Sequence, residues 1–239
     1  MASSYSTNAG LELVTTGEKA GLWGDITNTN LQILEQTATG YLSVDMAGAS
    51  VTLTLTNGAT SNGKNIYLRL YGTLAADRTL TMPATANRVW IVKDETVRGT
   101  SNRTLGVLTA SGTTQPIPPG ATVLCRSNGT QTDVTILSQG YATITDSNSP
   151  YTSVAGAQIF ANTTANPITI NLPASPTVGD EVSVLDTRGT WNSNNCTIGR
   201  NGQPINSATS DLTLNTNGQA ITLVYVDATR GWAYKTNTA

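Results

Sequence analysis

Acidic side chains are the groups in this chain best able to carry out chemistry, because its 239 residues include no histidine. Two adjacent pairs stand out, Asp94-Glu95 and Asp180-Glu181. Neighbouring residues of a strand point to opposite faces, so neither pair forms an acid–base couple by itself. A glycosidase could still join two acids from distant strands, but acids this scattered favour turns and loops. We therefore expect no catalytic residue and no enzyme, with a small polysaccharide depolymerase as the least favoured alternative.

The two cysteines, Cys125 and Cys196, lie far apart in the chain. They are too few for a disulfide framework, and without histidine they cannot complete a zinc site. Cys125 lies in the apolar run 121–125, which favours a buried free thiol, although one disulfide between the two halves stays open. Acid-initiated turns at 186–189 and 227–231 would bind calcium only if several oxygens converged there. We expect no metal and no cofactor.

Tryptophans offer flat faces on which a sugar ring could stack. Trp90 lies within an apolar strand pattern and is expected in the core, whereas Trp232 ends a hairpin pattern and is expected to cap the sandwich. Trp191 follows Gly189-Thr190 and precedes an asparagine-rich stretch, which favours an exposed position. Trp191 is therefore the candidate for contact with a glycan, with ordinary loop packing as the alternative.

The composition excludes several classes of function. Charged residues make up 12% of the chain, against about 25% in typical proteins. The 13 lysines and arginines are spread singly, so the chain lacks the basic patch that nucleic-acid binding requires. No apolar run approaches the roughly 20 residues of a membrane span, so we expect no membrane insertion. Surfaces rich in Thr, Asn, Ser and Gly carry little charge repulsion and can pack against copies of themselves.

Residues 1–40 differ from the rest of the chain and contain its one convincing helix pattern. Asp25 is expected to cap this helix, apolar residues follow it at helical spacing, and the pattern ends before Thr39-Gly40. A lone short helix is marginal in water, so it must pack on the chain's own β domain, on copies of itself in an oligomer, or on a partner protein. We therefore predict that residues 1–40 form an attachment segment. The expected assembly residues are Leu11, Leu13, Leu22, Trp23, Ile26, Ile33 and Leu34.

From residue 41 apolar residues alternate with polar ones, for example over 51–56 and 66–71, which indicates strands with one buried and one wet face. Alternation of this kind is typical of antiparallel sheets. We predict a mainly β fold, with two antiparallel β-sandwich or jelly-roll-like units over residues 41–139 and 140–239, preceded by one short N-terminal helix. Asn-Gly pairs favour tight hairpin turns, and they occur at Asn57, Asn62, Asn128, Asn201 and Asn217.

The two halves share a faint repeat, which could be a duplication or a chance similarity of threonine-rich strands. The matched segments are 52–55 with 169–172, 63–68 with 179–184, 104–106 with 197–199, and 120–125 with 218–224.

The opening stretch, residues 10–31 (Gly-Leu-Glu-Leu-Val-Thr-Thr-Gly-Glu-Lys-Ala-Gly-Leu-Trp-Gly-Asp-Ile-Thr-Asn-Thr-Asn-Leu), resembles the start of tail-fibre and related virion proteins of tailed bacteriophages, particularly aquatic ones. The closing stretch is similar to the β-rich ends of such fibres over 168–172, 179–180, 197–202 and 222–232. Together these segments cover roughly a third of the chain, and the opening stretch is the more specific.

The resemblance implies a non-enzymatic structural protein of the virion, usually a homotrimer, that attaches through its N-terminal segment and projects its β domains for host adhesion. Its implied partners are copies of itself, other virion proteins of the tail or capsid, and a host surface glycan. The chain is short and has no heptad-patterned shaft. Capsid decoration, or a head fibre that stabilises the shell, is therefore the alternative to the tail position, which is favoured.

Overall fold

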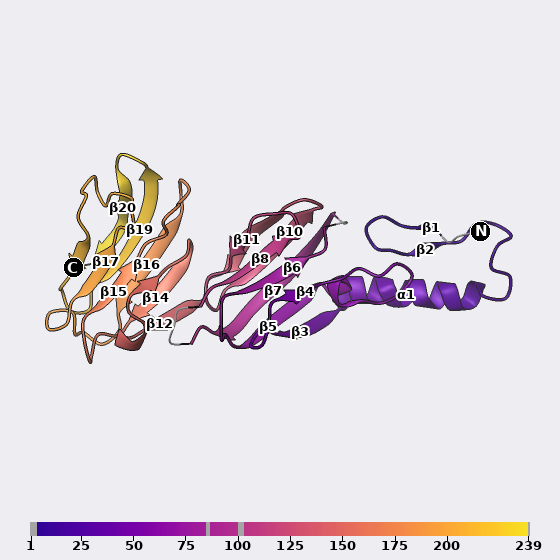
Figure 1. Ribbon diagram of the computed structural model, residues 1–239, viewed down its shortest axis with the longest axis horizontal. Helices are drawn as coiled ribbons and strands as arrows, with labels where there is room; N and C mark the ends of the chain where they lie inside the picture. Colours follow the sequence, from indigo (N-terminus) through magenta and orange to yellow (C-terminus); the bar gives the residue numbers. More distant parts are fainter. Residues whose placement is uncertain (1–3, 85–86, 100–102, 239) are drawn as a thin grey trace. The chain divides into compact units, whose positions relative to one another are not determined.

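The computed structural model describes residues 4–84, 87–99 and 103–238 (Figure 1). The chain divides into two compact units. Most of the chain up to Leu137 belongs to the first unit, and Ser138–Ala239 with two short earlier segments forms the second. The N-terminal segment holds the short strands β1 (Ser4–Tyr5) and β2 (Glu12–Leu13) and the helix α1 (Trp23–Thr39).

In the first unit the chain winds as a coil, and its successive strands alternate between two sheets. One sheet takes β3 (Tyr41–Asp45), β5 (Tyr67–Thr73) and β7 (Asn87–Val97), and the other takes β4 (Val51–Thr52), β6 (Arg78–Met82) and β8 (Leu105–Thr109). Each strand pairs in parallel with the corresponding strand of the preceding coil. The 3-10 turn η1 (Asn62–Lys64) lies in the connection from β4 to β5.

The coil of the first unit ends in strands that reverse direction. β9 (Gln115–Pro116) pairs antiparallel with β8, and β10 (Thr122–Asn128) pairs antiparallel with β7. β11 (Thr132–Ser138) then lies next to β10 at the edge of its sheet.

The second unit repeats this succession of strands. β12 (Tyr141–Ile144), β14 (Ala157–Ala161) and β16 (Glu181–Asp186) form one parallel set, and β13 (Tyr151–Thr152), β15 (Ile168–Asn171) and β17 (Cys196–Gly199) form the other. β18 (Leu212–Leu214), β19 (Ala220–Asp227) and β20 (Gly231–Thr238) close the unit with antiparallel pairing. The turn η2 (Asp146–Asn148) precedes β13.

The predicted pair of antiparallel β-sandwich or jelly-roll-like units is therefore wrong, because the sheets form a β-solenoid of about six turns. Alternation of apolar and polar residues indicates a strand with one buried face, but it does not distinguish parallel from antiparallel neighbours. The Asn-Gly signal was misleading in the same way. Asn128-Gly129 does join β10 to its sheet neighbour β11, but Asn57-Gly58 and Asn217-Gly218 lie where the chain crosses from one sheet to the other.

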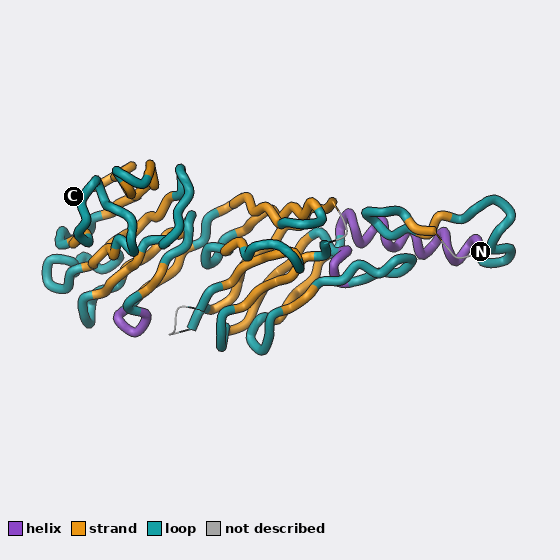
Figure 2. Tube along the Cα trace, turned by 45° about the horizontal axis from the view of Figure 1, so that its top comes forward, coloured by secondary structure: helices purple, strands orange, loops and turns teal. Residues whose placement is uncertain are grey.

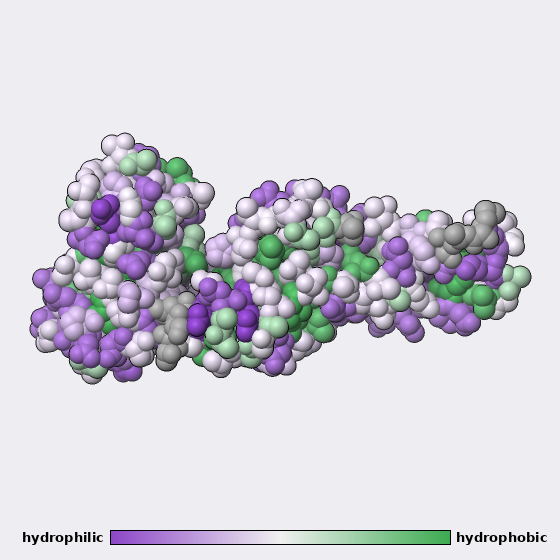
Figure 3. Space-filling model, viewed as in Figure 1, coloured by the Kyte–Doolittle hydropathy of each residue, from purple (hydrophilic) through white to green (hydrophobic). Residues whose placement is uncertain are grey.

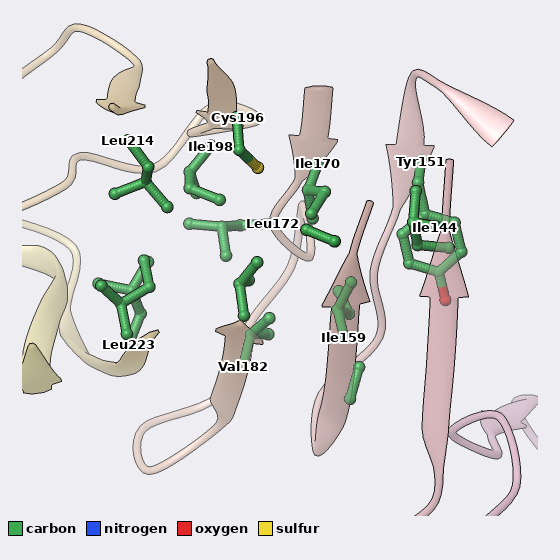
Figure 4. Close-up of a cluster of buried hydrophobic side chains, with 14 of the residues drawn as sticks. Ile144, Tyr151, Ile159, Ile170, Leu172, Val182, Cys196, Ile198, Leu214 and Leu223 are labelled. Atoms are coloured by element: carbon green, nitrogen blue, oxygen red, sulfur yellow. The ribbon is translucent and has the colours of Figure 1, made fainter. Parts of the chain in front are cut away.

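The core of each unit lies between its two sheets. In the second unit, side chains from β14 and β16 meet those from β15 and β17 (Figure 4). Parallel register places equivalent residues of successive coils in rows, so that Ile159 neighbours Val184, and Ile168 neighbours Cys196. Single apolar residues stacked in this way bury one another, which lets a chain with few aromatic residues fill its core.

Two details show that the units are built alike beyond their strand order. Each opens with a glycine that precedes the first strand and a tyrosine that begins it, Gly40-Tyr41 at β3 and Gly140-Tyr141 at β12. Each also places a buried aspartate at the same point of its third coil, where Asp94 pairs across from Leu70 and Asp186 pairs across from Ala161.

The repeat predicted from sequence agrees with this topology in part. Segments 104–106 and 197–199 lie at the equivalent strands β8 and β17, and segments 120–125 and 218–224 lie at β10 and β19. The other two matches are displaced by one coil. Segment 52–55 follows the start of β4, in the first coil of its unit, whereas 169–172 begins on β15, in the second coil. Segment 63–68 reaches β5, in the second coil, whereas 179–184 reaches β16, in the third. Successive coils resemble one another, so a local match cannot identify which coil it belongs to.

Candidate assembly surface on the N-terminal helix

The helix α1 forms because residues 23–39 lack proline and place apolar side chains at helical spacing. It begins at Trp23, two residues before the predicted cap, and Leu22 precedes it without a side-chain capping bond. Asp25 lies instead in the first turn, where its negative charge is favourable near the positive end of the helix dipole. At the other end, the Gly40 N–H donates to the Gln36 carbonyl oxygen at 2.9 Å.

Residues 4–21 fold back along the helix, so that β1 and β2 lie beside α1 (Figures 1 and 2). The Asn30 amide holds them there, because it accepts a hydrogen bond from the Glu12 N–H and donates one to the Glu12 carbonyl, both at 2.9 Å. Lys19 pairs with the Glu12 carboxylate at 3.2 Å. The folded-back segment is thus fixed to one face of the helix by its backbone.

Within the first unit, the N-terminal segment also contacts the coiled strands. The Gly58 N–H donates to the Gly10 carbonyl at 2.7 Å, and the Ser61 N–H donates to Gln36 Oε1 at 3.2 Å. Gly10 has a positive φ of 63°, and a Cβ added there would lie 2.8 Å from Asn57 Oδ1. A glycine is therefore required where the segment contacts the loop after β4.

The helix has one covered face and one uncovered face. Ile33 is fully buried and Ile26 is half-buried on the covered face. Trp23 and Leu34 lie about 60–100° around the helix from that face, and Leu31 lies about 140–160° from it. Their exposed fractions are 65% for Trp23, 57% for Leu31 and 45% for Leu34. Figure 3 shows hydrophobic surface over the start of α1. We call Trp23, Leu31 and Leu34 the helix stripe.

The residues predicted for assembly divide between these two faces. Leu13 and Leu22 are exposed near the start of the helix, in addition to Trp23 and Leu34 of the helix stripe. Leu11 and Ile26 are half-buried within the segment. Ile33 is buried by the chain's own packing, so it is not part of a free surface.

Leu31 was missed by the sequence reasoning. It lies eight residues after Trp23 and three before Leu34, a spacing that would have shown all three on one face of a helix.

Trp191 does not lie on the surface, because its side chain is 0% exposed within the core of the second unit. The predicted glycan contact at Trp191 is therefore corrected, since no sugar can reach the ring. The polar loop around it is drawn inward by Asp186. The Asp186 carboxylate accepts hydrogen bonds from the N–H groups of Arg188, Gly189 and Trp191 at 3.1, 2.9 and 3.4 Å.

The carboxylates weighed as catalytic groups have structural roles. Asp94 is buried and accepts bonds from the Thr96 N–H at 2.9 Å and the Thr96 hydroxyl at 2.7 Å. Glu95 pairs with Arg69 at 2.6 Å, and Glu181 pairs with Lys235 at 2.6 Å. Their side chains are directed to partners of this chain rather than to a shared site.

Metal-binding clusters of histidine, cysteine, aspartate and glutamate are absent from the described residues. Cys125 and Cys196 are both free and buried, which answers the question that the sequence left open. Burial raises the pKa of each thiol to about 12, and for Cys196 the nearby charge of Asp186 adds to this effect. Within the described part of the chain, no helix is both long and apolar enough to cross a lipid bilayer.

Comparison with known proteins gives little further guidance. No family model and no curated protein matches the chain. Among solved structures it is similar to a chain from a "Structure of a chaperone-substrate complex", at 13% identity and a TM-score of 0.35, over 82% of this chain and 35% of that one. This chain thus spans about a third of the length of the chain it matches. A likeness at this TM-score supports no conclusion about fold or function.

Proposed function

We propose that this chain is a non-enzymatic structural protein of a tailed-bacteriophage particle, a fibre or spike that self-associates as a homotrimer. In this proposal residues 1–40 dock it to the particle, and the β units project for adhesion to a host glycan. The observation that carries the proposal is the helix stripe, Trp23, Leu31 and Leu34, which leaves apolar side chains in water on one side of α1. The resemblance of residues 10–31 to phage fibre proteins gives the same assignment, and a β-solenoid is compatible with a fibre.

Little of α1 is buried by the rest of the described chain. Ile33 is the one side chain of the helix that the described structure buries fully. A helix with so little buried surface is marginal by itself, since helices depend mainly on packing of an apolar face. Covering a leucine or tryptophan of the helix stripe contributes about 1.5–3 kcal/mol. Contact between copies of the helix, and with a docking protein, therefore accounts for both the helix and its exposed residues.

Light scattering on the purified chain tests the assembly. We expect the mass of three chains for the unaltered protein, and a monomer for the double variant Trp23→Ser, Leu34→Ser. Val178→Ser is the matched control, because Val178 is also exposed but lies outside the attachment segment, and it should leave the mass unchanged. A monomeric unaltered protein at micromolar concentration would refute self-association.

Gold-labelled antibodies on intact particles test the location. Label at the tail supports a fibre or spike, whereas label over the head would favour capsid decoration. Particles that exclude the double variant while accepting Val178→Ser would support docking through the helix.

A further inference from the structure

The outer face of the sheet β12-β14-β16-β19-β20 carries a shallow pocket. Tyr141 at the start of β12 stacks on Phe160 of β14, with ring centroids 4.5 Å apart and planes 19° apart. Tyr141 is nevertheless 58% exposed, so much of its ring faces solvent. The pair therefore forms a flat aromatic platform whose underside is held by the protein.

A row of polar side chains runs beside this platform. The strand register places Tyr141 next to Gln158, Gln158 next to Ser183, and Ser183 next to Thr222. Neighbouring strands lie about 4.8 Å apart, so this row offers an amide and two hydroxyls at regular intervals from the ring. The Ser183 and Thr222 hydroxyls are 2.9 Å apart and hydrogen-bonded to each other. Leu185 supplies an apolar wall in the row beside Phe160.

The pocket is uncharged. None of its lining residues is acidic or basic. Glu181 and Lys235, which do not line the pocket, pair with each other, with Lys235 Nζ 2.6 Å from Glu181 Oε1. A charged ligand would therefore gain nothing here to offset the loss of its hydration.

These features match one ligand chemistry. A pyranose ring has a C–H face that stacks on an aromatic ring and hydroxyls around its edge that bond to amides and hydroxyls. We infer that this pocket binds a neutral saccharide, with the sugar ring on Tyr141 and its hydroxyls toward Gln158 and Ser183. This inference rests on the glycan adhesion of the proposed function, and it assigns that adhesion to the second unit and to Tyr141 instead of Trp191.

The first unit provides a matched comparison. Tyr41 occupies the equivalent position at the start of β3, stacks on Tyr67 at 5.6 Å and 15°, and is 56% exposed. Its surroundings differ, because the outer face there carries the ion pair of Arg69 and Glu95. Tyr41 is thus an equally exposed, stacked tyrosine without a neutral polar row beside it.

The test is a titration of the purified full chain with neutral oligosaccharides of glucose, galactose, mannose and N-acetylglucosamine, followed by saturation-transfer NMR and calorimetry. Oligogalacturonate serves as the acidic comparison. We expect at least one neutral saccharide to bind. Tyr141→Ala should weaken that binding by about tenfold, the scale of one lost stacking contact, while Tyr141→Phe and Tyr41→Ala bind as the unaltered chain does. Tyr141→Phe keeps the ring and removes only the hydroxyl, so its retention of binding assigns the loss in Tyr141→Ala to the ring.

Three results would overturn the inference, and they are distinguishable. Unchanged affinity in Tyr141→Ala would leave glycan adhesion standing but not at this pocket. Binding of oligogalacturonate alone would reject a neutral ligand. If no saccharide bound, glycan adhesion would be removed from the proposed function as well, while the proposed assembly through α1 would be unaffected by that result. A change in oligomeric mass in Tyr141→Ala would make this face a contact between copies.

Discussion

Replacing Asp186 by alanine should destabilise the second unit strongly, although Asp186 is not a catalytic residue. Its carboxylate is buried and accepts hydrogen bonds from the N–H groups of Arg188, Gly189 and Gly218 at 3.1, 2.9 and 3.0 Å. The Trp191 N–H adds a longer bond at 3.4 Å. One side chain therefore joins the loop after β16 to the loop before β19.

The size of the effect follows from the three shorter bonds. A hydrogen bond to a buried or charged partner contributes about 1 kcal/mol or more net, and a buried donor left without an acceptor costs a similar amount. With some water entering the vacated space, the loss in unfolding free energy should be about 3 kcal/mol. With a urea m-value of about 2 kcal/mol per M for a unit of this size, the unfolding midpoint falls by about 1.5 M. Asp186→Asn keeps one acceptor oxygen and should lose less.

Tryptophan fluorescence in urea measures this shift, because Trp191 and Trp232 are both buried in the second unit. Asp227→Ala is the matched control. The Asp227 carboxylate also accepts two backbone N–H bonds, at 2.8 and 2.7 Å, which lower its pKa, but it lies at an exposed turn where water replaces it. The urea unfolding midpoint of Asp227→Ala should therefore change little. An Asp186→Ala midpoint as high as that of Asp227→Ala would refute the role assigned to the buried carboxylate.

Two other predictions concern the backbone and the thiols. In Gly231→Ala the new Cβ would overlap the Pro204 carbonyl oxygen, so circular dichroism on heating should show a loss of more than about 3 kcal/mol in unfolding free energy. Gly218 is equally left-handed but unobstructed, so Gly218→Ala should lose about 1 kcal/mol. The thiols of Cys125 and Cys196 have pKa values of about 12 against an ordinary 9.0, so they should resist iodoacetamide at pH 9 until urea is added. Because the pKa is raised in the folded state, the stability that the neutral thiols contribute should be complete below pH 9 and be lost as the pH rises toward 12. Rapid alkylation of the folded chain would contradict their burial.

The sequence allowed prediction of a mainly β chain with an N-terminal helix, because period-two and helical spacings are local properties. It did not allow prediction of the solenoid. Strands such as β4 and β13 span two residues each, too short to leave a pattern, and their partners lie a whole coil away. Parallel pairing is a long-range property that no short window contains.

The positions of the candidate residues show which features a local sequence pattern can predict. Trp191 looked exposed because its neighbours are polar, but the buried Asp186 carboxylate binds those neighbours and turns them inward. Tyr141 drew no attention because the position of its ring depends on Phe160, 19 residues later. The exposed part of α1 was predictable, since Trp23 and Leu34 follow helical spacing within one segment.

The closing antiparallel strands of each unit have a consequence for how such a chain changes length. Because β9–β11 and β18–β20 seal the last coil of their units, the interior coils contact like neighbours on both sides. A whole coil could then be inserted or deleted without rebuilding either end, as in other linear repeat architectures. The length of a unit would then change in steps of one coil, while its closing strands and the N-terminal segment stayed the same.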